Sequence, residues 1–253
     1  MRLKDKVAIV TGGANGIGKA YCFGLASEGA KVVIADIDEK AAIATAKEIE
    51  ANGGKALPVK VDVSVEESTL GMAKKTFETF GKIDILVNNA ALYVRTPLTM
   101  APFQELDLKE WDRLMAVNLK GPFLCARAVF PYMREQKSGK IINITSDTFF
   151  FGRIHLAHYV ASKGGVIGLT RVLANELGQF NINVNCIAPG ATLSEDPDDL
   201  KSLERRKLSV PLRALKRVEY PQDLVGTLIF LASPDSDFIT GQTIAVNGGQ
   251  SFS

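Results

Sequence analysis

The sequence has little of what marks several large classes of protein. Its three cysteines, Cys22, Cys125 and Cys186, lie far apart among 253 residues. Such a set is too small and too uneven for a disulfide framework and lacks the spacing of a zinc site. We expect them to be buried free thiols in a reducing compartment. No metal site is predicted, because the two histidines, His155 and His158, have no further ligands at a usual spacing.

An excess of charge of one sign is also missing. The chain has 30 Lys and Arg against 28 Asp and Glu, a net charge of +2, and these residues are scattered. This balance gives no basic surface for nucleic acid or for an anionic membrane. No uncharged run approaches the ~20 residues of a membrane-spanning helix, and we see no signal peptide. We therefore expect a cytoplasmic protein that acts on a small-molecule substrate.

What the sequence does contain is a regular alternation of strand and helix patterns. Apolar runs typical of buried strands lie at residues 7–10, 31–35, 57–61, 83–87, 140–144, 182–187 and 243–246. Helical patterns follow the first run up to Gly29 and then occupy about 39–52, 66–80, 107–133 (bent or interrupted near Gly121-Pro122) and 159–177. Apolar strands alternating with helices predict a parallel sheet covered on both faces. We predict an α/β fold: one doubly wound (Rossmann) domain of about seven strands over residues 1–253.

A glycine-rich turn, TGGANGIG at residues 11–18, follows the first strand and opens the first helix. Here Gly12 would allow the tight turn, Gly16 would let the backbone approach a pyrophosphate, and Gly18 would let helix pack on strand. The helix N-terminus would then face the phosphates. We include Asn15 and Ile17 in this predicted dinucleotide site. A glycine-rich turn without any ligand is the alternative.

Polar residues end three further strands at the edge where open α/β sheets bind ligands. An acid at the end of the second strand, Asp36, can accept hydrogen bonds from an adenosine ribose and would repel a 2′-phosphate. This predicts NAD rather than NADP as cofactor, and the uncharged Asn15 and Ile37 agree with it. For Asp36 and Asp62 the alternative is a helix N-cap. The predicted adenine and ribose contacts are Asp62, Val63, Asn88, Asn89 and Ala90.

A candidate catalytic group lies later in the chain. Tyr159 and Lys163 are four residues apart on a predicted helix and so share a face. An ammonium beside a phenol lowers the phenol's pKa, and a phenolate can take the proton of an alcohol. Ser146, at the end of the fifth strand, could hold the oxygen that loses this proton. Taken alone, a Tyr-x-x-x-Lys pair is more often a solvated helix face.

The segment between Ser146 and Tyr159 must pass the mouth of such a site. It contains three consecutive phenylalanines at 149–151, and we expect Phe149 and Phe150 to line the substrate pocket with Ser146 and Tyr159. That all three are core or subunit-interface residues stays open. Long connections at 91–102 and 192–215 are predicted substrate loops. A Ser-His-Asp arrangement of Ser146 with His158 is disfavoured, because no nucleophile-elbow motif surrounds the serine.

Together these motifs resemble the short-chain dehydrogenase/reductase family. The glycine turn, Asp62-Val63, Asn88-Asn89-Ala90, Asn118, Ser146, Tyr159-x-x-x-Lys163 and Pro189-Gly190 stand in the family's order and spacing over essentially the whole chain. Within the family the sequence looks most similar to NAD-dependent secondary-alcohol dehydrogenases of the 1-phenylethanol dehydrogenase kind. It departs from the usual pattern at Ala91, where glycine is common, and at Thr192 and Ser194, which follow Pro189-Gly190.

The resemblance implies a role for each matched residue. Tyr159 would be the general acid/base, Lys163 would bind the nicotinamide ribose, Ser146 would orient the substrate oxygen, and Asn118 would hold a water linked to Lys163. From the residues alone, Asn118 indicates only a kink or a core hydrogen bond. Pro189, Gly190, Thr192 and Ser194 would surround the nicotinamide, with the Thr192 backbone N–H and the Ser194 hydroxyl facing its carboxamide. Members of the family are mostly homotetramers and sometimes homodimers, so a tetramer is expected.

The prediction is an NAD-dependent oxidoreductase that interconverts a hydrophobic or aromatic secondary alcohol and its ketone. Two alternatives stay open. One is a reductase of 3-oxoacyl groups on a carrier protein, disfavoured by Asp36 and by the lack of a basic docking patch. The other is a non-catalytic NAD-binding sensor on the same fold, which would have no need of all four residues Asn118, Ser146, Tyr159 and Lys163.

Overall fold

Seven parallel strands form the centre of the computed structural model, which describes residues 1–93, 98–195 and 199–252. The sheet order is β3-β2-β1-β4-β5-β6-β7, so the strand order reverses between β1 and β4, as in a doubly wound sheet. This confirms the predicted fold class. The strands are β1 Val7–Thr11, β2 Lys31–Asp36, β3 Lys55–Lys60, β4 Ile85–Asn88, β5 Gly139–Ile144, β6 Ile182–Pro189 and β7 Thr243–Val246.

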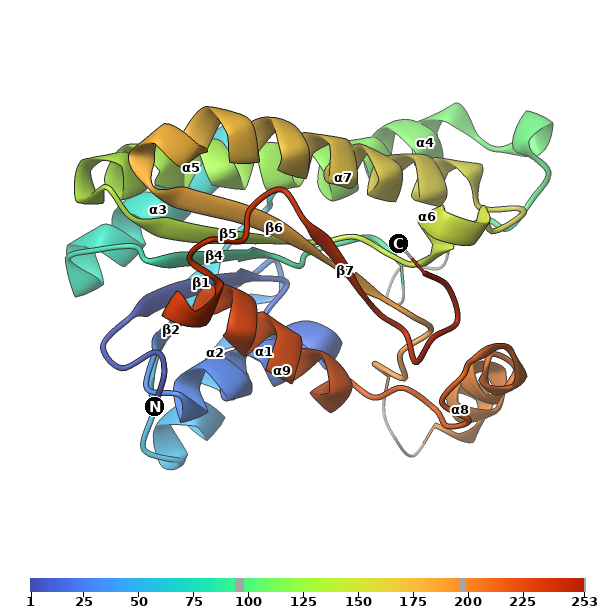
Figure 1. The fold of residues 1–253 in the computed structure, drawn as a ribbon, viewed down its shortest axis with the longest axis horizontal. Helices are drawn as coiled ribbons and strands as arrows, with labels where there is room; N and C mark the ends of the chain where they lie inside the picture. Colours follow the sequence, from blue (N-terminus) through green and yellow to red (C-terminus); the bar gives the residue numbers. More distant parts are fainter. Residues whose placement is uncertain (94–97, 196–198, 253) are drawn as a thin grey trace.

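Helices cover both faces of the sheet (Figure 1). One layer consists of α1 Gly16–Ser27, α2 Glu39–Ala51 and α9 Gln222–Ala232, and the other of α3 Glu66–Phe80, α4 Leu108–Met115, α5 Gly121–Gln136 and α7 Ala157–Leu177. Two shorter helices, α6 Thr148–Phe151 and α8 Leu200–Lys207, lie beyond the ends of β5 and β6. Helix α9 was not predicted, whereas α8 falls within the predicted substrate loop 192–215.

The central strands are apolar on both sides because each side packs against a helix layer. Along β1, Ala8 and Val10 join the core cluster that contains residues of α1, α2 and α9, whereas Ile9 joins the cluster with α3, α5 and α7. All five residues of β1 are buried. Successive strand side chains point to opposite faces, so a two-sided core requires a continuous apolar run rather than an alternating one.

The parallel arrangement brings the carboxyl ends of all strands to one edge of the sheet. Thr11, Asp36, Asn88, Ile144 and Pro189 are the last residues of β1, β2, β4, β5 and β6. Motifs that lie far apart in the sequence therefore meet at this edge. The glycine turn enters α1 there, and the chain leaves β5 there toward Ser146.

The long helix predicted over 107–133 is interrupted, as expected, but by a change of helix type. A π-helical turn, Ala116–Lys120, separates α4 from α5, and Pro122 lies in the first turn of α5. A π-turn widens the helix locally and is found frequently at functional sites. Asn118 lies in this turn and its side chain is buried.

Candidate active site

Three predicted catalytic side chains meet where β5 ends and α7 begins. The Tyr159 phenol interacts with the Ser146 side chain. One helical turn further along α7, the Lys163 ammonium nitrogen lies 5.9 Å from the centre of the Tyr159 ring. All three residues are buried in the polypeptide, with 6% of Tyr159, 7% of Ser146 and 3% of Lys163 exposed. A buried phenol, hydroxyl and amine so arranged can exchange a proton with an oxygen held between the first two.

The electrostatics of Tyr159 differ from the prediction. Burial raises the pKa of its phenol, the nearby Tyr93 raises it further, and the interaction with Ser146 opposes these effects. The Lys163 amine instead donates to the carbonyl of Ile144 at 2.9 Å. In the polypeptide alone the pKa of Tyr159 is therefore raised, because desolvation of the phenolate is the larger effect. The expected effect of Lys163 on this pKa stays a prediction.

Burial also acts on Lys163, in the opposite direction. Desolvation lowers the pKa of its ammonium from 10.5 to about 8, because the charged form loses its hydration inside the protein. The helix is held to the strand at this point by two bonds. Besides the Lys163 amine on Ile144, the Thr145 hydroxyl donates to the Lys163 carbonyl at 2.7 Å. The amine is thus fixed at the end of β5, and with a pKa of about 8 it is still mostly protonated at neutral pH.

The glycine turn has the tight geometry that a pyrophosphate site requires. Gly12 and Gly16 have left-handed φ values of +62° and +53°, and a Cβ on Gly12 would lie 2.8 Å from the Cα of Ala90. A Cβ on Gly18 would overlap the carbonyl oxygen of Gly12. No described side chain caps the N-terminus of α1 at Asn15, and its first turn has no acidic residue. Its N–H groups and positive dipole end therefore suit an anionic group.

The predicted acidic residues lie at the same edge, and neither caps a helix. Asp36 is half-buried and accepts from the backbone N–H groups of Ala14 and Asp38, each at 3.0 Å. It therefore fixes the glycine turn, while Asp38 is the N-cap of α2. Asp62 accepts from the backbone and hydroxyl of Ser64 in the turn before α3. The expected contacts of Asp36 and Asp62 with an adenosine remain predictions.

The amides that follow β4 have a structural use that the sequence did not reveal. Asn88 is buried and donates to Asn143 at 2.9 Å, linking β4 to β5 inside the sheet. Asn89 donates to the carbonyl oxygens of Thr11 and Gly12 at 2.9 and 3.0 Å. The amide nitrogens of both side chains thus stabilise the sheet and the glycine turn.

Comparison with known proteins agrees with this geometry. Residues 6–202 match the family model described as short chain dehydrogenase. The chain belongs to the short-chain dehydrogenase family. It is 40% identical over 251 residues to the (2S)-[(R)-hydroxy(phenyl)methyl]succinyl-CoA dehydrogenase subunit BbsD of Thauera aromatica, covering 99% of this chain and 98% of that one.

Two other proteins extend the comparison. The 3-oxoacyl-[acyl-carrier-protein] reductase FabG of Thermotoga maritima is 38% identical over 250 residues, covering 98% of this chain and 99% of its own. The crystal structure of a short-chain type dehydrogenase/reductase from Mycobacterium marinum superposes with a TM-score of 0.89 at 33% identity, over 99% of this chain and 97% of that one. This short-chain dehydrogenase is therefore an oxidoreductase of a family that binds a nicotinamide dinucleotide.

The π-helical turn explains the position of Asn118 in this short-chain dehydrogenase. The Asn118 side-chain oxygen accepts from the Leu92 backbone N–H at 2.8 Å, and its amide group lies 3.5 Å from the Ser162 hydroxyl. Asn118 therefore joins the connection after β4 to the catalytic helix. This agrees with the core hydrogen bond inferred from the residues alone, and the water predicted from the resemblance is not tested.

Tyr93 is a site residue that the sequence did not single out. Its ring stacks on that of Tyr159, with centroids 4.7 Å apart and planes inclined by 28°. Leu98, Leu114 and Leu156 pack in the same small cluster. Part of the predicted substrate loop 91–102, residues 94–97, lies outside the described residues. The hydrophobic pair Leu92-Tyr93 shortly after a strand was the signal available in the sequence.

The three phenylalanines lie on the one-turn helix α6. Phe149 and Phe151 are each 43% exposed and Phe150 is half-buried. The Phe149 ring packs against Gly164 of α7, where a Cβ would lie 2.8 Å from it, and forms an edge contact with Phe150. None of the three is a core residue, so the alternatives that remain are a substrate pocket and a subunit interface. No described contact joins them to Tyr93, which stacks on Tyr159 instead.

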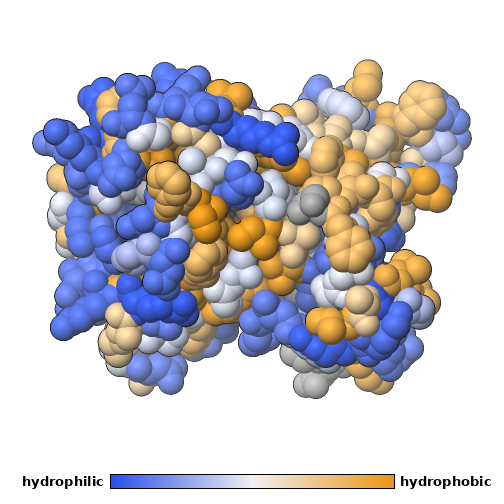
Figure 2. All heavy atoms as spheres, viewed as in Figure 1, coloured by the Kyte–Doolittle hydropathy of each residue, from blue (hydrophilic) through white to orange (hydrophobic). Residues whose placement is uncertain are grey.

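Exposed apolar side chains continue beyond α6. Ile154 is 75% exposed, and Leu208, which follows α8, is 77% exposed. Figure 2 shows hydrophobic residues gathered on the side of the molecule where α6 and α8 lie, whereas the opposite end is mostly hydrophilic. The predicted loop 192–215 contributes α8 to this side, and its residues 196–198, including Pro197 and Asp198, lie outside the described residues.

The loop that leaves β6 meets the glycine turn directly. A Cβ on Gly16 would lie 2.9 Å from the Ser194 carbonyl oxygen. The Thr192 backbone N–H donates to the Gly190 carbonyl at 2.8 Å. It is therefore already used, contrary to the expectation that it faces the nicotinamide carboxamide. Pro189 accepts from the Asp147 backbone N–H at 3.0 Å, which joins the ends of β5 and β6 next to Ser146.

Asp147 is a buried acid that the sequence did not single out. Burial raises its pKa from 3.8 to about 7, and the negative charge of Glu219 adds to this, while the Asn247 amide and the Arg213 guanidinium oppose it. Only 2% of the residue is exposed. An acid with such a pKa adjacent to Ser146 makes the site sensitive to pH near neutrality.

His158 is turned away from Ser146. Its ring is fully buried and lies 3.1 Å from the Glu110 carboxylate, between α7 and α4. This arrangement argues against a Ser-His-Asp reaction centre.

The described residues include no cluster of three or more possible metal ligands. Cys22, Cys125 and Cys186 are buried and free, as predicted. Nor is any described helix both long and apolar enough to cross a membrane.

Proposed function

We propose that this short-chain dehydrogenase interconverts a secondary alcohol and its ketone with NAD. The observation that carries the proposal is the buried group of Tyr159 and Ser146, whose side chains interact, with Lys163 one turn away. In the oxidation, Ser146 holds the substrate oxygen and Tyr159 takes the proton of the hydroxyl group. The bound dinucleotide supplies the hydride acceptor. In the reverse direction Tyr159 returns the proton to the alcohol oxygen.

Tyr159 must lose its proton to act as a base, and its own burial opposes this. We infer that the Lys163 ammonium supplies the nearby positive charge. With a pKa of about 8, it is still protonated at neutral pH. Asn118 contributes by holding the connection after β4 against α7. The whole set of Asn118, Ser146, Tyr159 and Lys163 argues against a non-catalytic sensor, which has no use for a proton-transfer group.

NAD is favoured over NADP because of the chain's own acid at the end of β2. Asp36 is half-buried and held in place by two backbone N–H groups. Its fixed negative charge would repel a 2′-phosphate, and the next residue, Ile37, is 65% exposed and offers no positive charge. A ribose with a free 2′-hydroxyl would instead donate a hydrogen bond to the carboxylate.

A hydrophobic or aromatic substrate is favoured by the groups near Tyr159. Tyr93 stacks on its ring, and α6 presents partly exposed phenylalanines beside α7. The name of the Thauera aromatica relative describes a secondary alcohol next to a phenyl ring, on a CoA thioester. The second candidate function is reduction of a 3-oxoacyl group on a carrier protein, supported by the 38% identity to the Thermotoga maritima reductase.

One experiment tests the chemistry and another tests the substrate class. Tyr159→Phe removes only the phenolic hydroxyl, so turnover should be lost while NADH still binds and the melting temperature stays close to wild type. Turnover by this variant at the wild-type rate would refute the proposed role. Rates with 1-phenylethanol, a polyol and a 3-oxoacyl thioester, each with NAD(H) and NADP(H), separate the candidates. A clear preference for the polyol would exclude an aromatic substrate.

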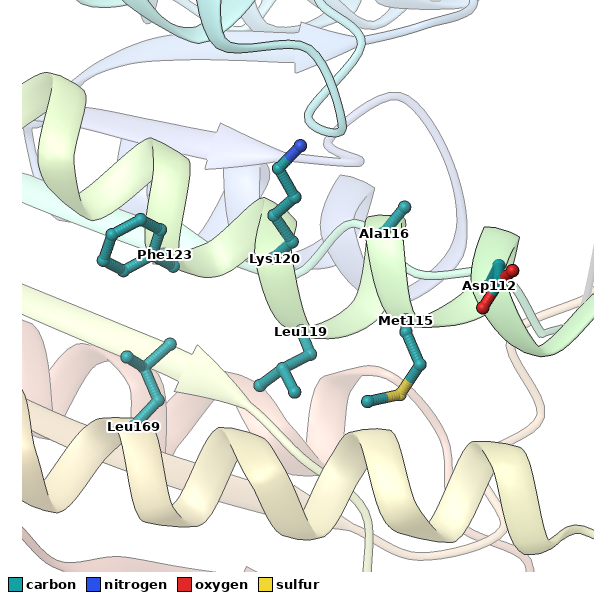
Figure 3. Close-up of a pocket in the computed structure, with 7 residues that line it drawn as sticks. All are labelled: Asp112, Met115, Ala116, Leu119, Lys120, Phe123 and Leu169. Atoms are coloured by element: carbon teal, nitrogen blue, oxygen red, sulfur yellow. The ribbon is translucent and has the colours of Figure 1, made fainter.

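We propose that the protein forms a homotetramer, with a homodimer as the alternative. Each subunit would be a single domain, and the protein would be cytoplasmic. The support for this assembly is an apolar cavity of about 490 Å³ on the outer side of α4, α5 and α7. Figure 3 shows Met115, Leu119 and Leu169 reaching into the space between these helices, with Phe123 beside them. A second copy could cover these side chains. Light scattering of the purified protein gives the subunit number, and a monomer would refute the assembly.

A further inference from the structure

A buried ion pair lies within the connection between β6 and α9, which also contains α8. Arg213 and Glu219 are 1% and 4% exposed, and the guanidinium Nη2 lies 3.3 Å from the carboxylate Oε2. Burying two charges is costly unless each also has other polar partners. Most partners of this pair belong to the segment 190–193, which directly follows the Pro189 at the end of β6.

Glu219 holds this segment at three points. Its Oε1 accepts from the Gly190 backbone N–H at 3.2 Å and from the Thr192 hydroxyl at 2.7 Å. Its backbone carbonyl accepts from the Leu193 N–H at 2.8 Å. The fit is close, because a Cβ on Gly190 would lie 2.5 Å from Oε2 of the same carboxylate. The carboxylate thus occupies the place that a side chain at 190 would need.

Arg213 holds the same segment from the other side. Its Nη2 donates to the Ala191 carbonyl at 3.1 Å, and its Nη1 donates to the Arg217 carbonyl at 3.1 Å. The pair therefore joins the chain segment that leaves β6 to the segment that leads into α9. A cavity of about 180 Å³ borders it, lined in part by Arg213, Glu219 and Val246.

We propose that Glu219 and Arg213 are positioning residues that set the affinity for the nicotinamide end of the dinucleotide. They do so by fixing the backbone of 190–193, the segment that continues to Ser194 opposite Gly16. The inference rests on the proposed function, because it assumes that a dinucleotide binds at this edge. A loop that is ordered before binding loses less entropy when the ligand arrives, so binding is tighter.

The test measures dinucleotide binding directly, without substrate, by titrating the folded protein with NADH and following its fluorescence. Glu219→Ala removes the carboxylate that accepts from the Thr192 hydroxyl and that shares the Gly190 N–H with the Val246 carbonyl. It should raise the dissociation constant by about tenfold, since two buried hydrogen bonds to the carboxylate are lost. Glu219→Gln keeps a carbonyl oxygen in that place and should recover part of the affinity. In steady-state kinetics the KM for NAD should rise more than kcat falls.

Asp223→Asn is the matched control. Asp223 pairs with Arg217 in the same segment at 2.7 Å but touches none of residues 190–193. The affinity of the Asp223→Asn variant for NADH should therefore stay at the wild-type value. Thr192→Val, which removes one hydroxyl, serves if Glu219→Ala does not fold. Wild-type affinity in Glu219→Ala, or in Thr192→Val where Glu219→Ala does not fold, would overturn the inference. Failure of the wild-type protein to bind NADH or NADPH would instead overturn the proposed function.

Discussion

Replacing Lys163 with methionine should inactivate the enzyme and at the same time stabilise its fold. Burial lowers the pKa of this ammonium from 10.5 to about 8. Each pH unit of such a shift corresponds to about 1.4 kcal/mol, so the charged lysine destabilises the folded state by about 3 kcal/mol at pH 7. Methionine has a similar length and no charge. Its one loss is the hydrogen bond to Ile144, which is worth about 1 kcal/mol.

The net gain at pH 7 is thus about 2 kcal/mol, which corresponds to about 4–8 °C in melting temperature for a chain of this size. The sign of the pH dependence provides a further check. Because the folded-state pKa is the lower one, the wild-type penalty is fully present below pH 8 and disappears as the pH rises toward 10.5. The advantage of Lys163→Met should therefore shrink by about 2 kcal/mol between pH 7 and pH 9.5.

Urea unfolding of both proteins at the two pH values measures this difference, and turnover is assayed in parallel. The reasoning would be refuted if Lys163→Met were less stable than wild type by the same amount at both pH values. That result would mean that the amine stabilises the fold through its bond to Ile144 and bears no cost of burial. A variant that keeps its turnover would contradict the proposed role of Lys163 in the reaction.

Three further predictions concern cofactor choice, pH and the glycine turn. Asp36→Asn keeps an acceptor for Ala14 but loses the charge, so the ratio of kcat/KM for NAD over NADP should fall by about tenfold; an unchanged ratio would exclude Asp36 as its source. Asp147→Asn should be up to about 4 kcal/mol more stable than wild type at pH 8 but not at pH 4. The reason is the raised pKa of about 7, which makes the wild type lose stability as the pH rises from 3.8 through 7. Equal stability of the two proteins at pH 8 would contradict the raised pKa of Asp147. Gly18→Ala, which forces a Cβ onto the Gly12 carbonyl, should cost about 1–3 kcal/mol, whereas a Cβ at Gly71 meets no atom within 4 Å and Gly71→Ala should cost nothing in the same urea titration.

The fold could be predicted, and the candidate catalytic residues could be named, because each depends on a local pattern. Continuous apolar runs between helices indicate a parallel sheet, and Gly12, Gly16 and Gly18 stand where only glycine fits the turn. Helix α9 was missed, although its Leu224 and Leu228 are fully buried. It is short and apolar on most of its surface, so its sequence shows no amphipathic contrast and no capping residue.

Other features depended on contacts between distant parts of the chain. Glu219 lies 27 residues from the Thr192 hydroxyl that donates to it, and nothing in the residues around either one indicates the bond. Asn118 was recognised through the resemblance, but its bond to Leu92 follows from a π-turn that no local preference predicted. Tyr93 gained its role only because the end of β4 meets α7, where its ring stacks on Tyr159.

The sequence by itself determined which groups are present and at which strand ends they appear, because side-chain chemistry and hydrophobic periodicity are local properties. Only the tertiary structure decided the pKa values of these groups. A Tyr-x-x-x-Lys pair predicts an acidified phenol if both groups are in water. In the folded chain both are buried, and the loss of hydration raises the pKa of Tyr159 and lowers that of Lys163. Burial is the sum of contacts from the whole chain, so no segment of the sequence contains it.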